Sequence, residues 1–379
     1  MDYRENTDEL AFRQRVRAWV TDNAPRNWRA ETKTEEQMGA LLRAWHRKLF
    51  EGGLVGLSWP TEFGGQGLTP TYEAILNDEL GAADTPRVSF HAYLGRAIFT
   101  YGTQAQKQHF LPAMLRGDMQ WCQGFSEPGA GSDLAGLRTY AELRGDKYVV
   151  NGQKMWTSGA QHADWCVMLV RTNRDVPKHK GISCLLTPTN VPGITIRPIK
   201  ISDGSPETCE MFFDDVEIPV ENRIGDEGAG WRIAMTVLSY ERGPADIGFI
   251  ATLKSTLRRL EGLAEETGRA NDPEIRKAIA RAYVVGEALR LNVMEQLSQR
   301  VAGKPPGPDG SVARLLLTQA EQTVRRLELE LTGADALTGR DESDAFGAYL
   351  RSRTISIFGG TSEIQKNILA NQVLGLPKA

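Results

Sequence analysis

The chain has 379 residues, of which 41% are hydrophobic and 25% are charged. This composition is ordinary for a globular protein with two or three domains, and it excludes a disordered or fibrous chain. The formal net charge of −3 provides no basic field, so nucleic acid is excluded as an expected partner.

Residues 1–118 predict an N-terminal domain made of helices. Apolar residues recur at three- and four-residue steps over 10–20 and 38–50, as they do on the buried face of a helix. A turn-rich loop is expected over 59–68. Further helices are expected over 69–80, 89–100 and 103–116.

Residues 119–226 predict a middle β-barrel or compact β-domain, because the apolar period changes from 3.6 to 2. Within 139–158, Gly145-Asp146 and Asn151-Gly152 are hairpin turn signals between short apolar runs. Further strands are expected over 165–171, 181–187, 193–196 and 208–216.

Residues 227–379 return to the helical period and predict a C-terminal domain of the four-helix-bundle type. Helices are expected over 230–267, 272–302, 310–331, 343–357 and 361–374. The fold class is therefore α+β with several domains. Apolar stripes left exposed on such helices would favour a dimer or tetramer.

The cysteines and the N-terminus indicate the compartment. The four cysteines are widely spaced without a Cys-x-x-Cys pair, which predicts reduced, buried thiols and no metal site. The N-terminus is acidic and lacks the apolar core of a secretory signal, and it does not resemble a transit peptide. No run approaches the roughly 20 apolar residues of a membrane-spanning helix. We therefore expect a cytoplasmic protein without a membrane span.

A glycine-rich loop over 124–136 reads GFSEPGAGSDLAG. Its backbone can lie flat against a ligand, and its N–H groups and hydroxyls suit a phosphate or a flavin ring, although such loops are more often plain turns. The loop precedes a β-meander that ends in Trp156-Thr157-Ser158. These two motifs in this order resemble the acyl-CoA dehydrogenase family, and the resemblance extends to GGTSEIQKNILANQVLGLP near the C-terminus.

The resemblance implies that the loop and the Trp-Thr-Ser segment hold FAD from two sides. Ser132 corresponds to a serine shared between the flavin pyrophosphate and the substrate. The positions that correspond to flavin contacts in the family are Gln123, Phe125, Ser126, Gly131, Ser132, Trp156, Thr157, Ser158, Thr361 and Glu363.

Members of this family remove an α-proton of an acyl-CoA with a glutamate while the β-hydrogen leaves as hydride to flavin N5. In many members the base lies in a Tyr-Glu-Gly-Thr segment, but here the segment is Phe358-Gly359-Gly360-Thr361 and has no carboxylate. A second location in the family, as in isovaleryl-CoA and long-chain acyl-CoA dehydrogenases, corresponds to Glu241. We therefore predict Glu241 as the base. The alternative is a solvated helix glutamate paired with a neighbouring arginine.

Two further substrate contacts follow from the resemblance. Gly359 keeps the main-chain N–H that polarises the thioester oxygen in the family, and its missing side chain would admit a branched or bulky acyl group. Arg242 corresponds to an arginine near the CoA moiety, although an arginine on a helix surface is about as common in general.

A second departure concerns the subunit interface. Family members often supply an Arg-x-x-Phe-Gly segment to the flavin of a neighbouring subunit, whereas residues 265–273 here read EETGRANDP, in which Arg269 is a candidate substitute. This difference is compatible with a heteromeric partner chain, and equally with a different homomeric contact.

We therefore predict an FAD-dependent acyl-CoA dehydrogenase of lipid metabolism, of the type used in fatty acid β-oxidation, that passes electrons to an electron-transfer flavoprotein or a similar acceptor. Two alternatives are kept. The first is a related oxidase or a dehydrogenase of acyl-carrier-protein thioesters. The second is a non-catalytic or half-site subunit of a heteromeric dehydrogenase.

Overall fold

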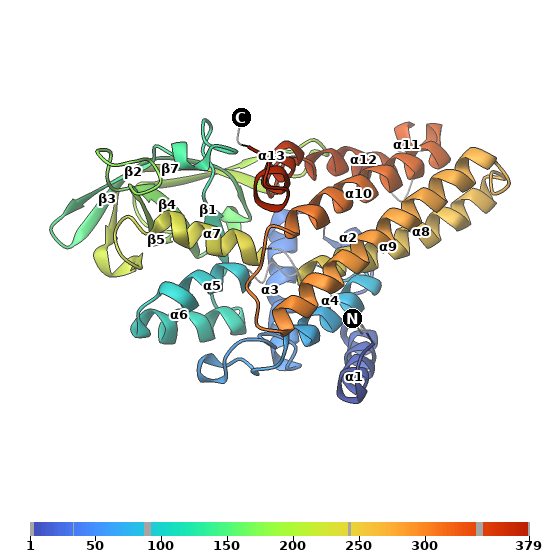
Figure 1. The fold of residues 1–379 in the computed structure, drawn as a ribbon, viewed down its shortest axis with the longest axis horizontal. Helices are drawn as coiled ribbons and strands as arrows, with labels where there is room; N and C mark the ends of the chain where they lie inside the picture. Colours follow the sequence, from blue (N-terminus) through green and yellow to red (C-terminus); the bar gives the residue numbers. More distant parts are fainter. Residues whose placement is uncertain (1–3, 33, 87–91, 242–243, 339–343, 378–379) are drawn as a thin grey trace.

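The computed structural model describes residues 4–32, 34–86, 92–241, 244–338 and 344–377. A β-sheet forms one end of the molecule and the long C-terminal helices form the other, with N-terminal helices below both (Figure 1). The expected arrangement of helical, sheet and helical regions along the chain is confirmed. The domain limits at 118 and 226 stay predictions.

The N-terminal region is helical, as expected. Side chains of Asn6, Thr34 and Thr103 cap three of its helices by accepting main-chain hydrogen bonds in the first turn. The short helix α2 was not predicted, and the expected helix start at 89 lies outside the described residues. The elements are α1 (Thr7–Asn23), α2 (Trp28–Glu31), α3 (Glu35–Glu51), η1 (Thr61–Phe63), α4 (Pro70–Ala82), α5 (Ala92–Tyr101) and α6 (Gln104–Arg116).

The middle region is an eight-stranded sheet in the order β6-β7-β3-β2-β4-β5-β8, with β1 paired parallel to β4. Two strands, β1 and β8, were not predicted. The strands are β1 (Trp121–Gly124), β2 (Tyr140–Arg144), β3 (Lys147–Ser158), β4 (Trp165–Arg171), β5 (Ile182–Pro188), β6 (Ile194–Ile199), β7 (Thr208–Pro219) and β8 (Arg223–Ile224).

One of the two predicted hairpin turns is wrong. Gly145-Asp146 joins β2 to β3 as expected, but Asn151-Gly152 lies inside β3 at a bulge in its pairing with β7. The amide of Asn151 bonds across the strands to Asp215, donating to its carboxylate at 2.8 Å and accepting from its main-chain N–H at 3.0 Å. Cross-strand pairing with β7 therefore outweighs the local turn signal.

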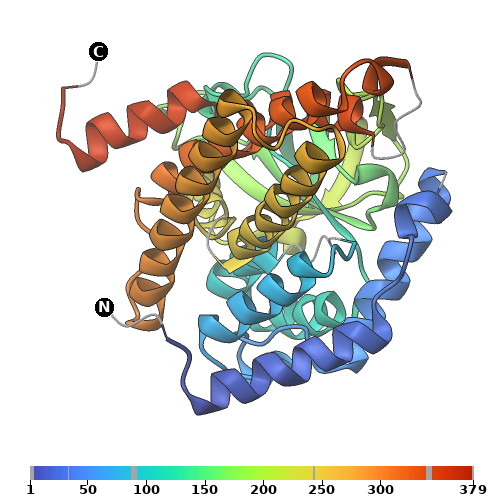
Figure 2. The same ribbon diagram turned by 90° about the vertical axis from the view of Figure 1, so that its right-hand side faces the viewer.

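The C-terminal region contains the long helices, and α8, α9 and α10 pack on one another (Figure 2). The segment expected to be helical over 230–267 contains two helices, since α7 ends at Tyr240 and α8 begins at Pro244. The elements are α7 (Gly230–Tyr240), α8 (Pro244–Glu266), α9 (Pro273–Val301), α10 (Gly310–Thr332), α11 (Ala334–Thr338), α12 (Ala345–Thr354), α13 (Ser362–Ile368) and a π-helical turn (Leu369–Val373).

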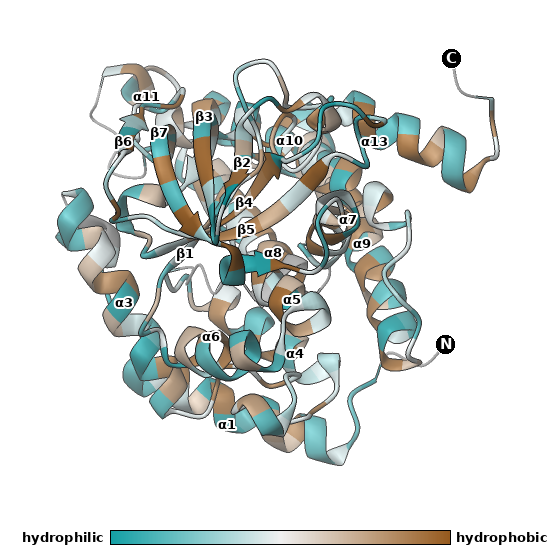
Figure 3. Ribbon diagram, turned by 90° about the vertical axis from the view of Figure 1, so that its left-hand side faces the viewer, coloured by the Kyte–Doolittle hydropathy of each residue, from teal (hydrophilic) through white to brown (hydrophobic). Residues whose placement is uncertain are grey.

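Alternate residues of β4 enter different hydrophobic cores. Val167 and Leu169 pack with residues of α5, α6 and α7, whereas Met168 packs with β3 and β7. Figure 3 shows apolar residues along the strands of the sheet. On α7, Ile233 and Val237 are fully buried, and each contributes about 1.5–3 kcal/mol by leaving water. This packing holds the end of α7 close to the sheet.

The described residues contain no helix long and apolar enough to cross a membrane and no group of three or more side chains suited to a metal ion. All four cysteines are buried and unpaired, as expected. The cytoplasmic location stays a prediction.

Candidate active site

The glycine-rich loop and the end of β3 lie side by side. The main-chain N–H of Met155 donates to the carbonyl of Ser126 at 2.9 Å. Ser126 belongs to the loop, and Met155 directly precedes Trp156. The two motifs that the sequence singled out are therefore neighbours in the fold.

A buried ion pair is formed by the two residues next to this contact in the chain, Lys154 and Glu127. The ammonium of Lys154 donates to the Glu127 carboxylate at 2.8 Å and to the carbonyl of Phe125 at 3.2 Å. The carboxylate also accepts hydrogen bonds from the main-chain N–H groups of Arg138 at 2.6 Å and Thr139 at 2.9 Å. Burial lowers the pKa of the Lys154 ammonium. Burial alone would raise the pKa of Glu127, but the charge of Lys154 and the hydrogen bonds to the carboxylate lower it by more.

The outer side of the loop is open. A Cβ atom added at Gly129 or Gly131 would meet nothing within 4 Å, and Ser132 is exposed. Phe125 is buried and Gln123 is half-buried at the end of β1. The loop thus presents main-chain groups and a hydroxyl to a space that a ligand can enter.

The end of β3 presents an aromatic ring and a hydroxyl. Trp156 has a left-handed backbone with φ of 62°, and the residue is 52% exposed although its side chain is large and apolar. The hydroxyl of Thr157 is buried, and no partner is found for it among the described residues, whereas Ser158 is exposed. An exposed ring, an unsatisfied hydroxyl and an open glycine-rich loop fit the ring system and phosphates of a flavin dinucleotide.

Glu241 follows α7 directly, and its main-chain N–H donates to the carbonyl of Val237 at 3.1 Å. The residue is half-buried rather than fully exposed. Its role as the base and the alternative, a helix glutamate paired with an arginine, therefore both stay predictions.

Helix α5 runs antiparallel to α7 and brings Tyr93 near Glu241. Tyr101 and Thr236 share a hydrogen bond of 2.9 Å, and the guanidinium of Arg96 lies 4.8 Å from the ring centre of Tyr240. Burial, then the negative charge of Glu241, then the nearby thiol of Cys122 raise the pKa of Tyr93. Tyr93 therefore feels both the candidate base and Cys122, the residue before Gln123.

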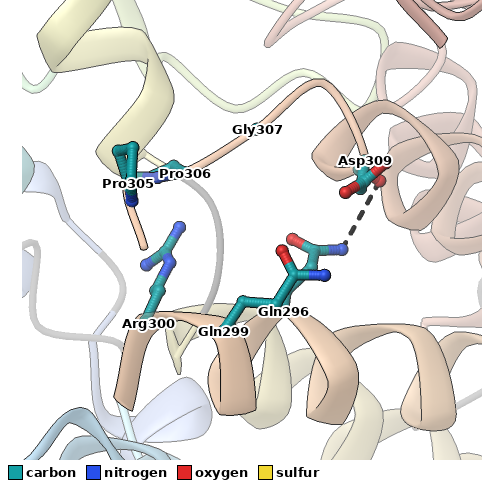
Figure 4. Close-up of a pocket in the computed structure, with 7 residues that line it drawn as sticks. All are labelled: Gln296, Gln299, Arg300, Pro305, Pro306, Gly307 and Asp309. Atoms are coloured by element: carbon teal, nitrogen blue, oxygen red, sulfur yellow. Dashed lines mark hydrogen bonds between the residues drawn. The ribbon is translucent and has the colours of Figure 1, made fainter. Parts of the chain in front are cut away.

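A small hollow lies at the end of α9, in the loop to α10 (Figure 4). Its volume of about 10 Å³ is close to that of one water molecule, so it does not hold a substrate. Arg300 in its wall lies 5.7 Å from the ring centre of Tyr240 and bonds to the carbonyl of Ser239 at 3.5 Å. The hollow thus borders the end of α7 rather than forming the site.

The C-terminal segment around Gly359 is held by two side chains. Gln365 donates to the carbonyls of Gly359 at 2.9 Å and Gly360 at 3.1 Å. Arg314 of α10 donates to the carbonyl of Phe358 at 2.6 Å. Gly359 has a left-handed backbone with φ of 65°, which a glycine adopts without strain.

For other predicted residues, the described hydrogen bonds do not involve the glycine-rich loop. Arg242 lies outside the described residues. Thr361 caps α13 by accepting from the N–H of Ile364 at 3.2 Å, and Glu363 is exposed in the same helix. In the described chain, the hydrogen bonds found for Thr361 stay within the C-terminal segment. Arg269 is bound within its own subunit, to Asp272 at 3.0 Å and to Glu330 at 3.2 Å.

The sequence reasoning missed the Lys154–Glu127 pair and Tyr93. A lysine among the apolar residues of β3 was a signal, since a charge on a buried face needs a partner. Tyr93 carried no signal of its own, because its place depends on how α5 packs against α7.

Three family models match successive parts of the chain. They describe the acyl-CoA dehydrogenase N-terminal domain (residues 6–118), middle domain (residues 122–216) and C-terminal domain (residues 228–374). Acyl-CoA dehydrogenase IpdE1 of Mycobacterium tuberculosis is 38% identical over 381 residues, covering 98% of this chain and 98% of that protein.

Solved structures resemble the chain over its full length. The ChsE4–ChsE5 complex from Mycobacterium tuberculosis gives a TM-score of 0.86 at 33% identity, and covers 100% of this chain and 100% of the matched one. The Tcur3481–Tcur3483 steroid ACAD gives a TM-score of 0.84 at 30% identity, again covering 100% of both chains.

Proposed function

Because the chain belongs to the acyl-CoA dehydrogenase family, we propose that it forms a double bond between the α- and β-carbons of an acyl-CoA thioester with Glu241 as the base. The chain is an oxidoreductase of that family. The observation that carries the base assignment is the half-buried position of Glu241 at the end of α7, within electrostatic reach of Tyr93.

The proposed cofactor is FAD, which when bound would accept the β-hydrogen as a hydride. The open glycine-rich loop with Gln123, Phe125, Ser126, Gly131 and Ser132 would hold one side of it. The end of β3 with Trp156, Thr157 and Ser158 would hold the other. We propose Thr361 and Glu363 of the C-terminal segment as further flavin contacts, although the hydrogen bonds described for Thr361 do not involve the loop.

The chain's own groups have three tasks in this reaction. Glu241, half-buried after the end of α7, would take the α-proton as the general base. The main-chain N–H of Gly359 would polarise the thioester oxygen as enolate charge develops. Arg242 is proposed to meet the CoA moiety as a fixed positive charge.

We propose a branched or bulky acyl group as substrate. Glycine at 359 would leave more room for the acyl group than the glutamate of many family members, and one solved relative is a steroid ACAD. The proposed electron acceptor is an electron-transfer flavoprotein.

We also propose that a second, different chain completes the oligomer. The solved relative ChsE4–ChsE5 is a complex of two named chains, and Arg269 here is occupied by acidic groups of its own subunit. If that second chain supplied the base, the present chain would be a half-site subunit, an alternative favoured by glycine at 359.

Anaerobic titration tests the proposal. The purified protein is mixed with straight, branched and steroid-like acyl-CoA thioesters, and bleaching of the flavin's visible band is followed with time. We expect Glu241→Gln to bind FAD as the parent does and to bleach about 10²–10⁴ times more slowly, because a general base is lost. Glu266→Gln, which removes an exposed carboxylate at the end of α8, is the matched control and should react at the parent rate.

Two outcomes would overturn the proposal. Bleaching of Glu241→Gln at the parent rate would remove Glu241 from the mechanism, and a parent protein that binds no FAD, either alone or co-expressed with a second acyl-CoA dehydrogenase chain, would remove the cofactor. Oxygen consumption with substrate and no other acceptor would instead identify an oxidase.

A further inference from the structure

We propose that Lys154 and Glu127 form a positioning pair for the flavin, which holds the glycine-rich loop and the end of β3 in the geometry that binds the cofactor. This inference rests on the proposed function, because it concerns the same flavin site. The pair itself does not touch the open side of the loop.

The carboxylate of Glu127 closes the loop on itself. Glu127 stands near the start of the loop, and its two oxygens accept hydrogen bonds from the N–H groups of Arg138 and Thr139, which follow the end of the loop. The main chain between them carries Gly131 and Ser132. The two ends of this flavin-contacting segment are therefore tied to one side chain.

The ammonium of Lys154 ties the closed loop to β3. It bonds to the carbonyl of Phe125 as well as to Glu127, and the next residue, Met155, bonds to the carbonyl of Ser126. The pairing of β3 with β7 shifts register between Lys154 and Thr157. Lys154 thus lies immediately before the irregular stretch of β3 that contains Trp156.

A buried ion pair contributes little net stability, because the loss of hydration of both charges offsets their attraction. The Lys154 side chain is 0% exposed and that of Glu127 is 7% exposed, so both charges have lost their water. Replacing such a pair by apolar residues of similar volume is often neutral or stabilising. Apolar residues cannot, however, supply hydrogen bonds to Phe125, Arg138 and Thr139. The ion pair therefore fixes the positions of these three main-chain groups, which apolar side chains could not do.

The double variant Lys154→Met/Glu127→Leu separates the two roles, because it removes both charges and leaves none unpaired. We measure thermal unfolding of the apoprotein and the Kd for FAD by quenching of flavin fluorescence. We expect a melting temperature lowered no more than in the control below, because the main-chain groups of Phe125, Arg138 and Thr139 lose their partners, and a Kd at least about tenfold higher, since hydrogen bonds to charged groups are lost from the loop. A double variant that binds FAD with the parent Kd would overturn the inference.

Glu79→Gln is the matched control. It removes a buried carboxylate that accepts hydrogen bonds from Arg13 and Arg17 in the N-terminal region, away from the loop. It should lower the melting temperature and leave the Kd for FAD unchanged. An equal rise in Kd in this variant would show that general destabilisation explains the effect, which would overturn the inference.

Hydrogen exchange on the parent protein is an independent test that needs no variant. If the pair holds the loop before FAD arrives, the amides of Arg138 and Thr139 are protected in the apoprotein as well as in the holoprotein. The amides of Gly129 and Gly131 should gain protection only when FAD is added. Fast exchange of the Arg138 and Thr139 amides in the apoprotein would contradict the inference. A parent protein that shows no FAD binding, either alone or with a second acyl-CoA dehydrogenase chain, would instead contradict the proposed function.

Discussion

The guanidinium of Arg314 lies over the ring of Phe358, 4.5 Å from its centre, and also donates to the main-chain carbonyl of that residue. A further hydrogen bond of 2.8 Å joins the same side chain to the carbonyl of Ile355. One side chain of α10 therefore holds the segment that leads into Gly359, the proposed donor to the thioester oxygen.

We predict that Arg314→Lys lowers kcat/KM about tenfold while the flavin content stays the same. An ammonium cannot stack on the ring and bond to two carbonyls in the same way, so the N–H of Gly359 loses its fixed direction. Steady-state kinetics with a good acyl-CoA check this. Arg326→Lys, on the exposed side of the same helix, should keep parent kinetics. Equal losses in both variants would argue against the assigned role.

Gly359→Ala should narrow the substrate range. A Cβ at this position would lie 3.4 Å from the Arg314 guanidinium, so it fits with little movement, although the left-handed backbone would cost about 1–2 kcal/mol. We expect kcat/KM to fall more for bulky acyl-CoA thioesters than for short straight ones.

Gly375→Ala is the control for that strain. Its φ of 66° is almost the same, and a Cβ there would meet nothing within 4 Å. It should lose similar stability and keep the parent order of substrates. A uniform loss over all substrates in Gly359→Ala would contradict the idea that this glycine sets the size of the acyl site.

The sequence predicted the long, strongly periodic elements well. The expected strand over 165–171 coincides with β4, whose residues alternate between two cores. Strand β1 was missed because it has four residues and depends on pairing with β4, which follows much later in the chain. Asn151-Gly152 was misread because its turn signal is local, while the pairing of β3 with β7 is not.

The site was predictable only in part, for the same reason. The two flavin motifs could be read as continuous segments, and the bond between Met155 and Ser126 brings them together. The partners Lys154 and Glu127 are 27 residues apart, and no local pattern joins them. Assignments that depend on tertiary packing, such as the place of Tyr93 near Glu241, needed the fold.

Trp156 gives a separate test of the flavin site. A bulky residue in the left-handed region is strained, by about 1–2 kcal/mol, and here the residue is also half exposed. We expect Trp156→Gly to change the stability of the apoprotein by less than about 1 kcal/mol, because relief of strain offsets the greater freedom of glycine in the unfolded chain.

The same variant should bind FAD much more weakly, because the ring that would pack on the flavin is gone, whereas Trp156→Phe should retain most of the affinity. Apoprotein melting and FAD titration measure the two effects. Parent-like FAD binding by Trp156→Gly would mean that the exposed ring serves another purpose.

The link between α1 and α4 predicts a pH-dependent stability. Glu79 is buried and accepts hydrogen bonds from Arg13 at 2.6 Å and from Arg17 at 2.8 and 2.9 Å. Burial alone would raise the pKa of Glu79, but the hydrogen bonds and charges of the two arginines lower it below its ordinary value. The stability that this carboxylate contributes is therefore fully present above its unfolded pKa of about 4.3, and it is lost as the pH falls through the lower folded pKa.

Glu79→Gln should accordingly reduce the free energy of unfolding by about 2 kcal/mol at neutral pH, a value below that for a fully buried pair because Arg17 is exposed. Urea unfolding followed by tryptophan fluorescence measures this at several pH values. The difference from the parent should shrink as the pH falls below about 4, because the parent carboxyl then becomes protonated and neutral as well. Glu62→Gln, at an exposed site, should match the parent throughout. A Glu79→Gln difference that stays constant down to low pH would show that packing, rather than charge, makes this contact stabilising.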